Sequence, residues 1–139
     1  LKKIQETNKN YNFIVRNEAL WDSDGTMDFY TSIDVWGDHG CTLDPTKTEK
    51  LDLDNPKKVK TIRLSDFINQ FPEENYIILK LDIEGAEYAV VSDLLSSGAI
   101  NRINELNIEW HDHLFNNKSS HGLKAELSKL NIPVNNNWM

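Results

Sequence analysis

The chain has 139 residues, a formal net charge of −7 at pH 7 and a single cysteine, Cys41. This length fits one domain that spans residues 1–139. The acidic balance argues against nucleic acid or an anionic membrane surface as a partner, because both would repel the chain. One cysteine excludes an internal disulfide and favours a reducing, cytoplasmic location. No apolar run reaches the ~18 residues that a membrane-spanning helix needs.

The first half of the chain predicts a short helix, two strands and a long loop. Residues 1–10 have the pattern of the last turns of a helix. Residues 12–21 are apolar enough for a strand buried on both faces, and residues 26–36 alternate like a second strand. The DSDG turn between them suggests that the two strands form a hairpin. Residues 37–58 predict a long loop, which is either a disordered excursion or a lid over a substrate.

The second half predicts strands and helices in alternation. Ser65 is the expected N-cap of a helix that ends at Pro72. The other predicted elements are strands at 59–64, 76–83 and 103–111, helices at 86–98 and 119–130, and an edge strand at 131–139. The strand at 76–83 is apolar on both faces by its pattern, which is typical of the centre of a parallel sheet. This order indicates an α/β fold with a mostly parallel sheet, whose ligands bind beyond the carboxyl ends of the strands.

Three carboxylates gather at the end of the predicted central strand. Asp82 and Glu84 fall on one side of it by alternation, and Gly85 lets the backbone turn sharply into the next helix. A carboxylate inside an apolar strand costs several kcal/mol unless it is paired, which favours a functional role for Asp82 and Glu84. Glu87 fits the first turn of the helix, where an acidic residue is common without any function.

The strand at 103–111 places a second set of polar residues at the same predicted edge. Glu109, His111 and His113 alternate, so they share a side if the strand extends that far. His111 is suited to proton transfer near neutral pH, and with Asp82 and Glu84 it could instead bind a divalent metal. His113 is expected to be a surface histidine after the strand.

Several other chemistries have no motif in this sequence. It contains no G-x-G dinucleotide loop, no P-loop, no G-x-S-x-G nucleophile elbow and no C-x-x-C pair. The remaining signal is therefore the carboxylate and histidine set.

These residues resemble a known family. The segment YIILKLDIEGAEYAVVSDLLSSGAI followed by INELNIEWH resembles the FkbM-type methyltransferases, and its K-x-D-x-E-G-x-E core is a fairly specific signature of that family. NEALWDSDGTMDFY looks like the family's segment after the third sheet strand, and VKTIRLSDFI looks like the strand and helix before the signature. The similarity covers nearly the whole chain in order.

The resemblance implies a Rossmann-like class I methyltransferase fold, with a mostly parallel sheet and an antiparallel edge strand. It implies S-adenosylmethionine as cofactor and methyl transfer to a hydroxyl of a sugar or another small molecule. The family's first strand and glycine-rich cofactor loop would precede Leu1. The chain is therefore expected to be the C-terminal portion of a methyltransferase domain, truncated at its N-terminus. A noncatalytic α/β remnant, a partner-binding module and a homo-oligomer remain open.

The resemblance also implies roles for individual residues. It places Glu18, Ala19 and Asp82 beside the cofactor, and Asp82, Glu84 and His111 at the catalytic centre. It places Glu87, Glu109 and His111 near the acceptor, with no metal ligand assigned.

Overall fold

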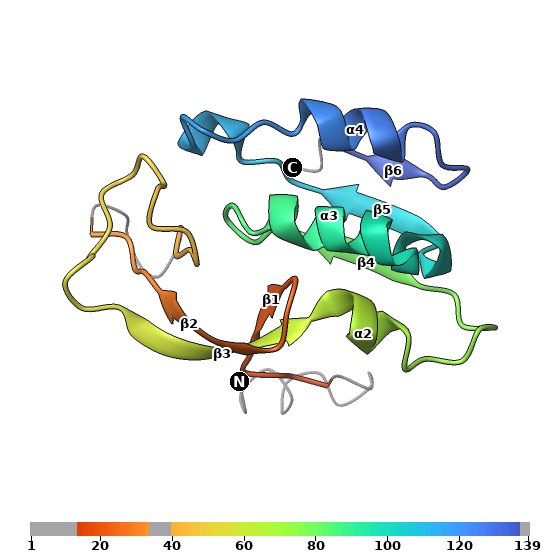
Figure 1. Cartoon of the computed structure of the whole chain (residues 1–139), viewed down its shortest axis with the longest axis horizontal. Coiled ribbons are helices and arrows are strands. Elements are labelled where there is room, and N and C mark those ends of the chain that lie inside the picture. Colours follow the sequence, from red (N-terminus) through yellow and green to blue (C-terminus); the bar gives the residue numbers. More distant parts are fainter. Residues whose placement is uncertain (1–13, 34–39, 137–139) are drawn as a thin grey trace, which may run out of the picture.

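The computed structural model describes residues 14–33 and 40–136 (Figure 1). Its elements, in chain order, are β1 (Ala19–Trp21), β2 (Gly25–Phe29), β3 (Lys57–Arg63), α2 (Leu64–Ile68), β4 (Ile78–Leu81), α3 (Glu87–Ser97), the 3₁₀ helix η1 (Ala99–Arg102), β5 (Glu105–Ile108), the 3₁₀ helix η2 (Asp112–Leu114), α4 (His121–Leu127) and β6 (Val134–Asn135). Four predicted features lie outside the described residues: the helix at 1–10, the strand ends at 12–13 and 34–36, the loop start at 37–39, and the last three residues.

The first sheet has the order β1-β3-β2. β1 runs parallel to β3 and β2 runs antiparallel to it, so Thr61 pairs with both Ala19 and Gly25. The predicted hairpin between residues 12–21 and 26–36 is therefore wrong, because β3 lies between the two strands. The turn that joins β1 to β2 instead wraps around the end of β3, where the carboxylate of Asp24 accepts the N–H of Arg63 at 2.8 Å.

Residues 14–18 do not form the buried strand that their apolar pattern predicts. Only the three residues of β1 pair with β3, and Ile14 is 89% exposed. An apolar sequence becomes a buried strand only where a neighbouring strand and a covering layer exist, and β1 has both for a short stretch only.

The second sheet is entirely parallel, in the order β4-β5-β6. β4 is therefore an outer strand of this sheet, and the prediction that it is central and apolar on both faces is wrong. Ile78 is 60% exposed and Lys80 is also exposed; by alternation both side chains lie on the same face of β4, so that face is open while Leu81 on the other face is buried. The C-terminal edge strand is confirmed as β6, and it is parallel; the antiparallel edge strand is β2 of the other sheet.

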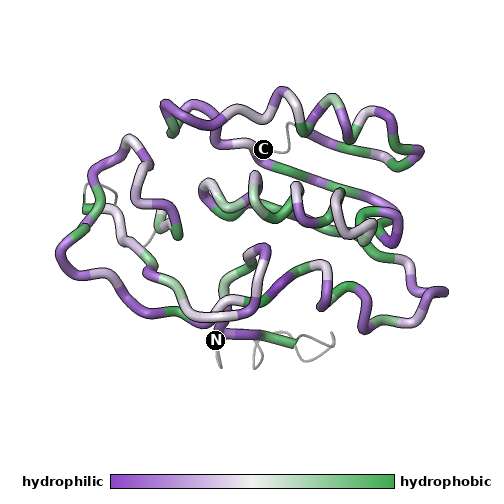
Figure 2. The backbone as a smooth tube through the Cα atoms, viewed as in Figure 1, coloured by the Kyte–Doolittle hydropathy of each residue, from purple (hydrophilic) through white to green (hydrophobic). Residues whose placement is uncertain are grey.

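Helix α3 lies within the predicted helix at 86–98 and forms the centre of the core. Val90, Val91 and Leu94 are fully buried against Leu81 and Leu106 of the parallel sheet. Figure 2 shows hydrophobic segments along this helix and the strands beside it. The helix ends at Ser97, and Gly98 takes the C-cap position with a left-handed φ of 77°, which glycine adopts readily.

Helix α2 begins two residues earlier than predicted, at Leu64. Arg63 takes the N-cap position without a side-chain cap, and Ser65 lies inside the first turn. Ser65 is fully buried, and its hydroxyl has no hydrogen-bond partner within residues 14–33 and 40–136. The capping prediction for Ser65 is wrong because β3 continues directly into the helix. The helix also ends at Ile68, before Pro72.

The loop at residues 40–56 packs against the body of the protein. Leu43 and Leu51 are buried, and single β-bridges join Tyr30 to Thr42 and Ser32 to Leu51. The described part of the predicted loop is therefore held against the segment that contains Tyr30 and Ser32.

No helix within the described ranges is long and apolar enough to cross a bilayer.

Candidate functional site

The chain turns sharply between β4 and α3. The N–H of Ala86 donates to the carbonyl of Ile83 at 3.3 Å, and the two residues between them have positive φ, 53° at Glu84 and 103° at Gly85. Two consecutive positive φ angles are typical of a type I′ turn, which costs a non-glycine residue about 1–2 kcal/mol. The hydroxyl of Thr42 donates to the carbonyl of Glu84 at 2.6 Å and helps to hold this conformation.

Glu87, the first residue of α3, is fully buried beneath this turn. Its carboxylate accepts the N–H of Ile83 and the N–H of Gly85, each at 2.8 Å. A third hydrogen bond, of 3.0 Å, joins it to Nδ1 of His111. Both oxygens of Glu87 are thus occupied, and the residue fixes the turn and the imidazole relative to each other.

His111 follows β5 and is 3% exposed. An ionised carboxylate can only accept hydrogen bonds, so the contact with Glu87 assigns the ring hydrogen to Nδ1 and leaves Nε2 to face the site. Burial alone would lower the pKa of His111. The hydrogen bond to Glu87 and the charges of the surrounding carboxylates outweigh that effect, and the pKa is raised above its usual value.

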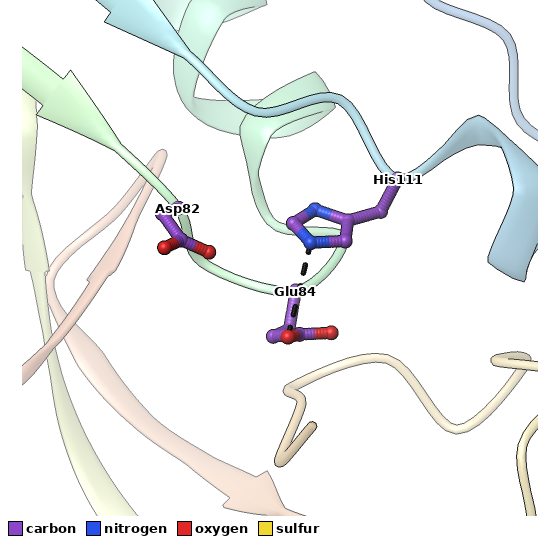
Figure 3. Close-up of side chains that lie close together, drawn as sticks. All are labelled: Asp82, Glu84 and His111. Carbon is purple, nitrogen blue, oxygen red and sulfur yellow. Dashed lines mark ion pairs between the residues drawn. The ribbon is translucent and has the colours of Figure 1, made fainter. Parts of the chain in front are cut away.

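Asp82, Glu84 and His111 converge at the carboxyl ends of β4 and β5, as the sequence predicts. One ligand atom from each lies within 4.8 Å of the other two. Figure 3 shows these side chains and the contact between Nε2 of His111 and Oε1 of Glu84, which measures 3.8 Å. Oε1 of Glu109 lies 3.9 Å from the same nitrogen. We call Asp82, Glu84 and His111 the carboxylate–histidine cluster.

Lys47 holds Glu84 from the opposite side. Its ammonium lies 2.8 Å from Oε2 of Glu84, from Oε2 of Glu49 and from the carbonyl oxygen of Gly40, and its side chain has no exposed surface. Burial alone would lower the pKa of Lys47, but its hydrogen bonds to the two glutamates outweigh burial and raise it. Lys47 therefore stays charged and leaves only Oε1 of Glu84 directed at His111.

Lys118 fixes the same turn from the segment before α4. It donates to the carbonyl of Gly85 at 2.8 Å and forms an ion pair with Asp44. Its ammonium also lies 5.0 Å from the ring centroid of Tyr88 and 4.6 Å from that of Phe115. The turn is thus held by cationic side chains from two distant segments.

A pocket of about 380 Å³ opens beside the cluster. Its apolar wall comes from the first sheet, the loop and the N-cap of α3, with Ala19, Leu20, Phe29, Leu43, Val59 and Ala86. Its acidic wall contains Glu18, Asp82 and Glu84. The hydrogen bonds of Glu18 to Arg16 and Lys60 lower the pKa of its carboxyl to about 2. The pocket is of the size and mixed character of small-molecule sites.

The structure divides the predicted site residues into two groups. Those predicted to lie beside the cofactor line one pocket together: Glu18, Ala19 and Asp82. The residues predicted near the acceptor lie around the imidazole of His111. The carboxylate of Glu87 is 3.0 Å from Nδ1, and that of Glu109 is 3.9 Å from Nε2. Their catalytic and binding roles stay predictions, and the complete burial of Glu87 favours positioning over contact with a ligand. His113 is exposed, as expected for a surface histidine.

Sequence reasoning missed three residues that hold the turn: Thr42, Lys47 and Lys118. Each comes from a segment without regular structure, and each contacts the turn through a long-range hydrogen bond. Only the length of the loop at 37–58 pointed to a function there, and it identified no individual residue.

Comparison with known proteins yields one match. A family model described as the methyltransferase FkbM domain matches residues 7–131, while searches of curated proteins and of solved structures returned no match. The match covers most of the chain, including β4, the carboxylate turn and His111. The chain therefore belongs to the FkbM methyltransferase family.

Proposed function

We propose that this protein takes part in S-adenosylmethionine-dependent methyl transfer to a hydroxyl of a sugar or another small molecule. The observation that carries the proposal is the position of the carboxylate–histidine cluster at the edge of a mostly apolar pocket. The family explains why methyl transfer is the reaction to expect there.

The residues that line the pocket fit such a cofactor. Its apolar wall, with Phe29, Leu43 and Val59, suits a purine ring. Asp82 and Glu84 provide negative charge at the same pocket, which favours a sulfonium. When bound, S-adenosylmethionine supplies an electrophilic methyl group for in-line displacement by the acceptor oxygen.

The cluster contributes proton transfer and charge. Nε2 of His111 faces the carboxylates and can take the proton of an acceptor hydroxyl. Glu87 keeps the ring oriented through Nδ1 and stabilises the imidazolium that forms. The carboxylates of Asp82 and Glu84 can hold the acceptor by hydrogen bonds, which aligns its oxygen for attack.

One observation favours a second candidate function, a noncatalytic module that binds a partner. Tyr76 and Ile78 are 70% and 60% exposed beside the outer edge of β4, and an uncovered strand edge recruits other strands. Self-association without methyl transfer would support this alternative.

The assay measures transfer of a labelled methyl group from S-adenosylmethionine to a mixture of small sugars and polyols. His111→Gln is expected to lower the rate about 10²–10⁴-fold, the usual effect of removing a general base. His121→Gln removes an exposed histidine on α4 and is expected to leave the rate unchanged. No transfer above the protein-free blank would contradict the proposed function. Equal rates for the two variants would remove His111 from the mechanism.

A further inference from the structure

We propose that Asp82, Glu84 and His111 bind a divalent transition-metal ion. Carboxylate oxygens and an imidazole nitrogen are ligands that such ions accept together. The proposal does not depend on methyl transfer, because metal binding can be measured without any acceptor or cofactor.

The first argument is the orientation of His111. Metal-binding histidines usually donate the hydrogen of one ring nitrogen to a carboxylate, which directs the other nitrogen at the ion. Glu87 is that carboxylate here: it is fully buried, bonded to two backbone N–H groups, and 3.0 Å from Nδ1. Nε2 has no hydrogen bond to any of the described residues, and His111 is only 3% exposed.

The second argument is the charge around Nε2. Oε1 of Glu84 and Oε1 of Glu109 lie 3.8 and 3.9 Å from it, beyond hydrogen-bonding distance. A lone pair that faces several carboxylates is unfavourable unless a positive charge lies between them, and either a proton on Nε2 or a bound cation supplies that charge. Lys47 does not fill that place, because it binds the other oxygen of Glu84.

The third argument is spacing. Two ligands about 2.1 Å from one ion lie ~3.0 Å apart at a right angle and ~4.2 Å apart when opposite. The 3.8 Å separation of Glu84 and His111 falls within this range, and all three ligand atoms lie within 4.8 Å. Asp82 can approach the other two ligands by side-chain rotation, since its side chain is 38% exposed and its contact among the described residues is an ion pair with Lys80 at 3.2 Å.

The ion would change the chemistry at the cluster. With Nε2 bound to a metal ion, His111 would be a ligand, and this role would replace the proton-accepting role proposed above for the metal-free site. A bound ion would lower the pKa of an acceptor hydroxyl beside it, and the carboxylate of Glu109, 3.9 Å from Nε2, would be placed to take the released proton.

Titration with Mn²⁺, followed by the electron paramagnetic resonance signal of the free ion, tests this directly. The wild-type chain is expected to bind one Mn²⁺ saturably and more tightly than Mg²⁺, because one ligand is nitrogen. Asp82→Asn and His111→Gln are each expected to weaken binding about 10-fold or more. Asp82 is exposed, so its variant remains informative even if the histidine variant unfolds.

The matched controls are Asp54→Asn and His121→Gln, which alter exposed residues of the same types outside the cluster. Unchanged binding in these controls, with loss in the cluster variants, supports the metal site. No saturable binding at millimolar Mn²⁺, or equal binding in cluster and control variants, overturns it. Methyl transfer that continues at full rate with a chelator would overturn a catalytic ion while leaving the proposed function intact.

Discussion

Replacement of Glu87 by alanine is expected to lower the free energy of unfolding by about 3–5 kcal/mol. The change removes a buried carboxylate that accepts two backbone N–H groups and binds Nδ1 of His111. Each buried donor left without a partner costs about 1–3 kcal/mol. The loss should appear as a lower midpoint in chemical denaturation.

The control for this prediction is Glu126→Ala. Glu126 lies on α4, is more than half exposed and, among the described residues, pairs with Lys129 on the surface, so its removal should change stability by less than about 0.5 kcal/mol. Glu87→Gln should fall between the two, because an amide keeps one acceptor oxygen but places a donor against a backbone N–H. Equal stability of the Glu87→Ala and Glu126→Ala variants would show that Glu87 does not fix the turn.

Gly85→Ala is expected to destabilise the protein by about 2–5 kcal/mol. Gly85 has a φ of 103°, which L-residues avoid. A methyl group at this position would lie 2.2 Å from Cζ of Phe115, a ring that is only 5% exposed. Backbone strain and overpacking therefore act together. Thermal or chemical unfolding of the variant measures the combined loss of stability from strain and overpacking.

Two comparisons separate these causes. Gly122→Ala, in α4, meets nothing within 4 Å and has no left-handed backbone, so it should be neutral or stabilising by about 0.5–1 kcal/mol. Adding Phe115→Ala to Gly85→Ala should remove the clash but not the strain, so the two changes should be less than additive. A Gly85→Ala variant as stable as the wild type would contradict the turn geometry.

The convergence of Asp82, Glu84 and His111 could be predicted because it follows from local rules. β4 and β5 are parallel neighbours with Leu81 paired to Ile108. The residues that follow these two positions must therefore emerge at the same edge. The apolar pattern of residues 86–98 and the glycine at their end were sufficient to predict helix α3.

Other features depend on contacts between distant segments, which local patterns do not contain. Nothing in the sequence of residues 12–36 shows that β3 inserts between β1 and β2. The apolar character of β4 fits an inner and an outer strand equally well, so its place at the edge could not be predicted. Lys47 resembles any loop lysine until the fold buries it against Glu84.

Binding of S-adenosylmethionine by calorimetric titration tests the central claim most directly, namely that the pocket beside the cluster is the cofactor site. We predict saturable binding by the wild-type chain. Ala19→Phe fills the pocket and should weaken binding at least 10-fold, about 1.4 kcal/mol. Ala125→Phe, the same change at an exposed position of α4, should leave binding unchanged. Absence of binding, or equal affinity in both variants, would contradict the account.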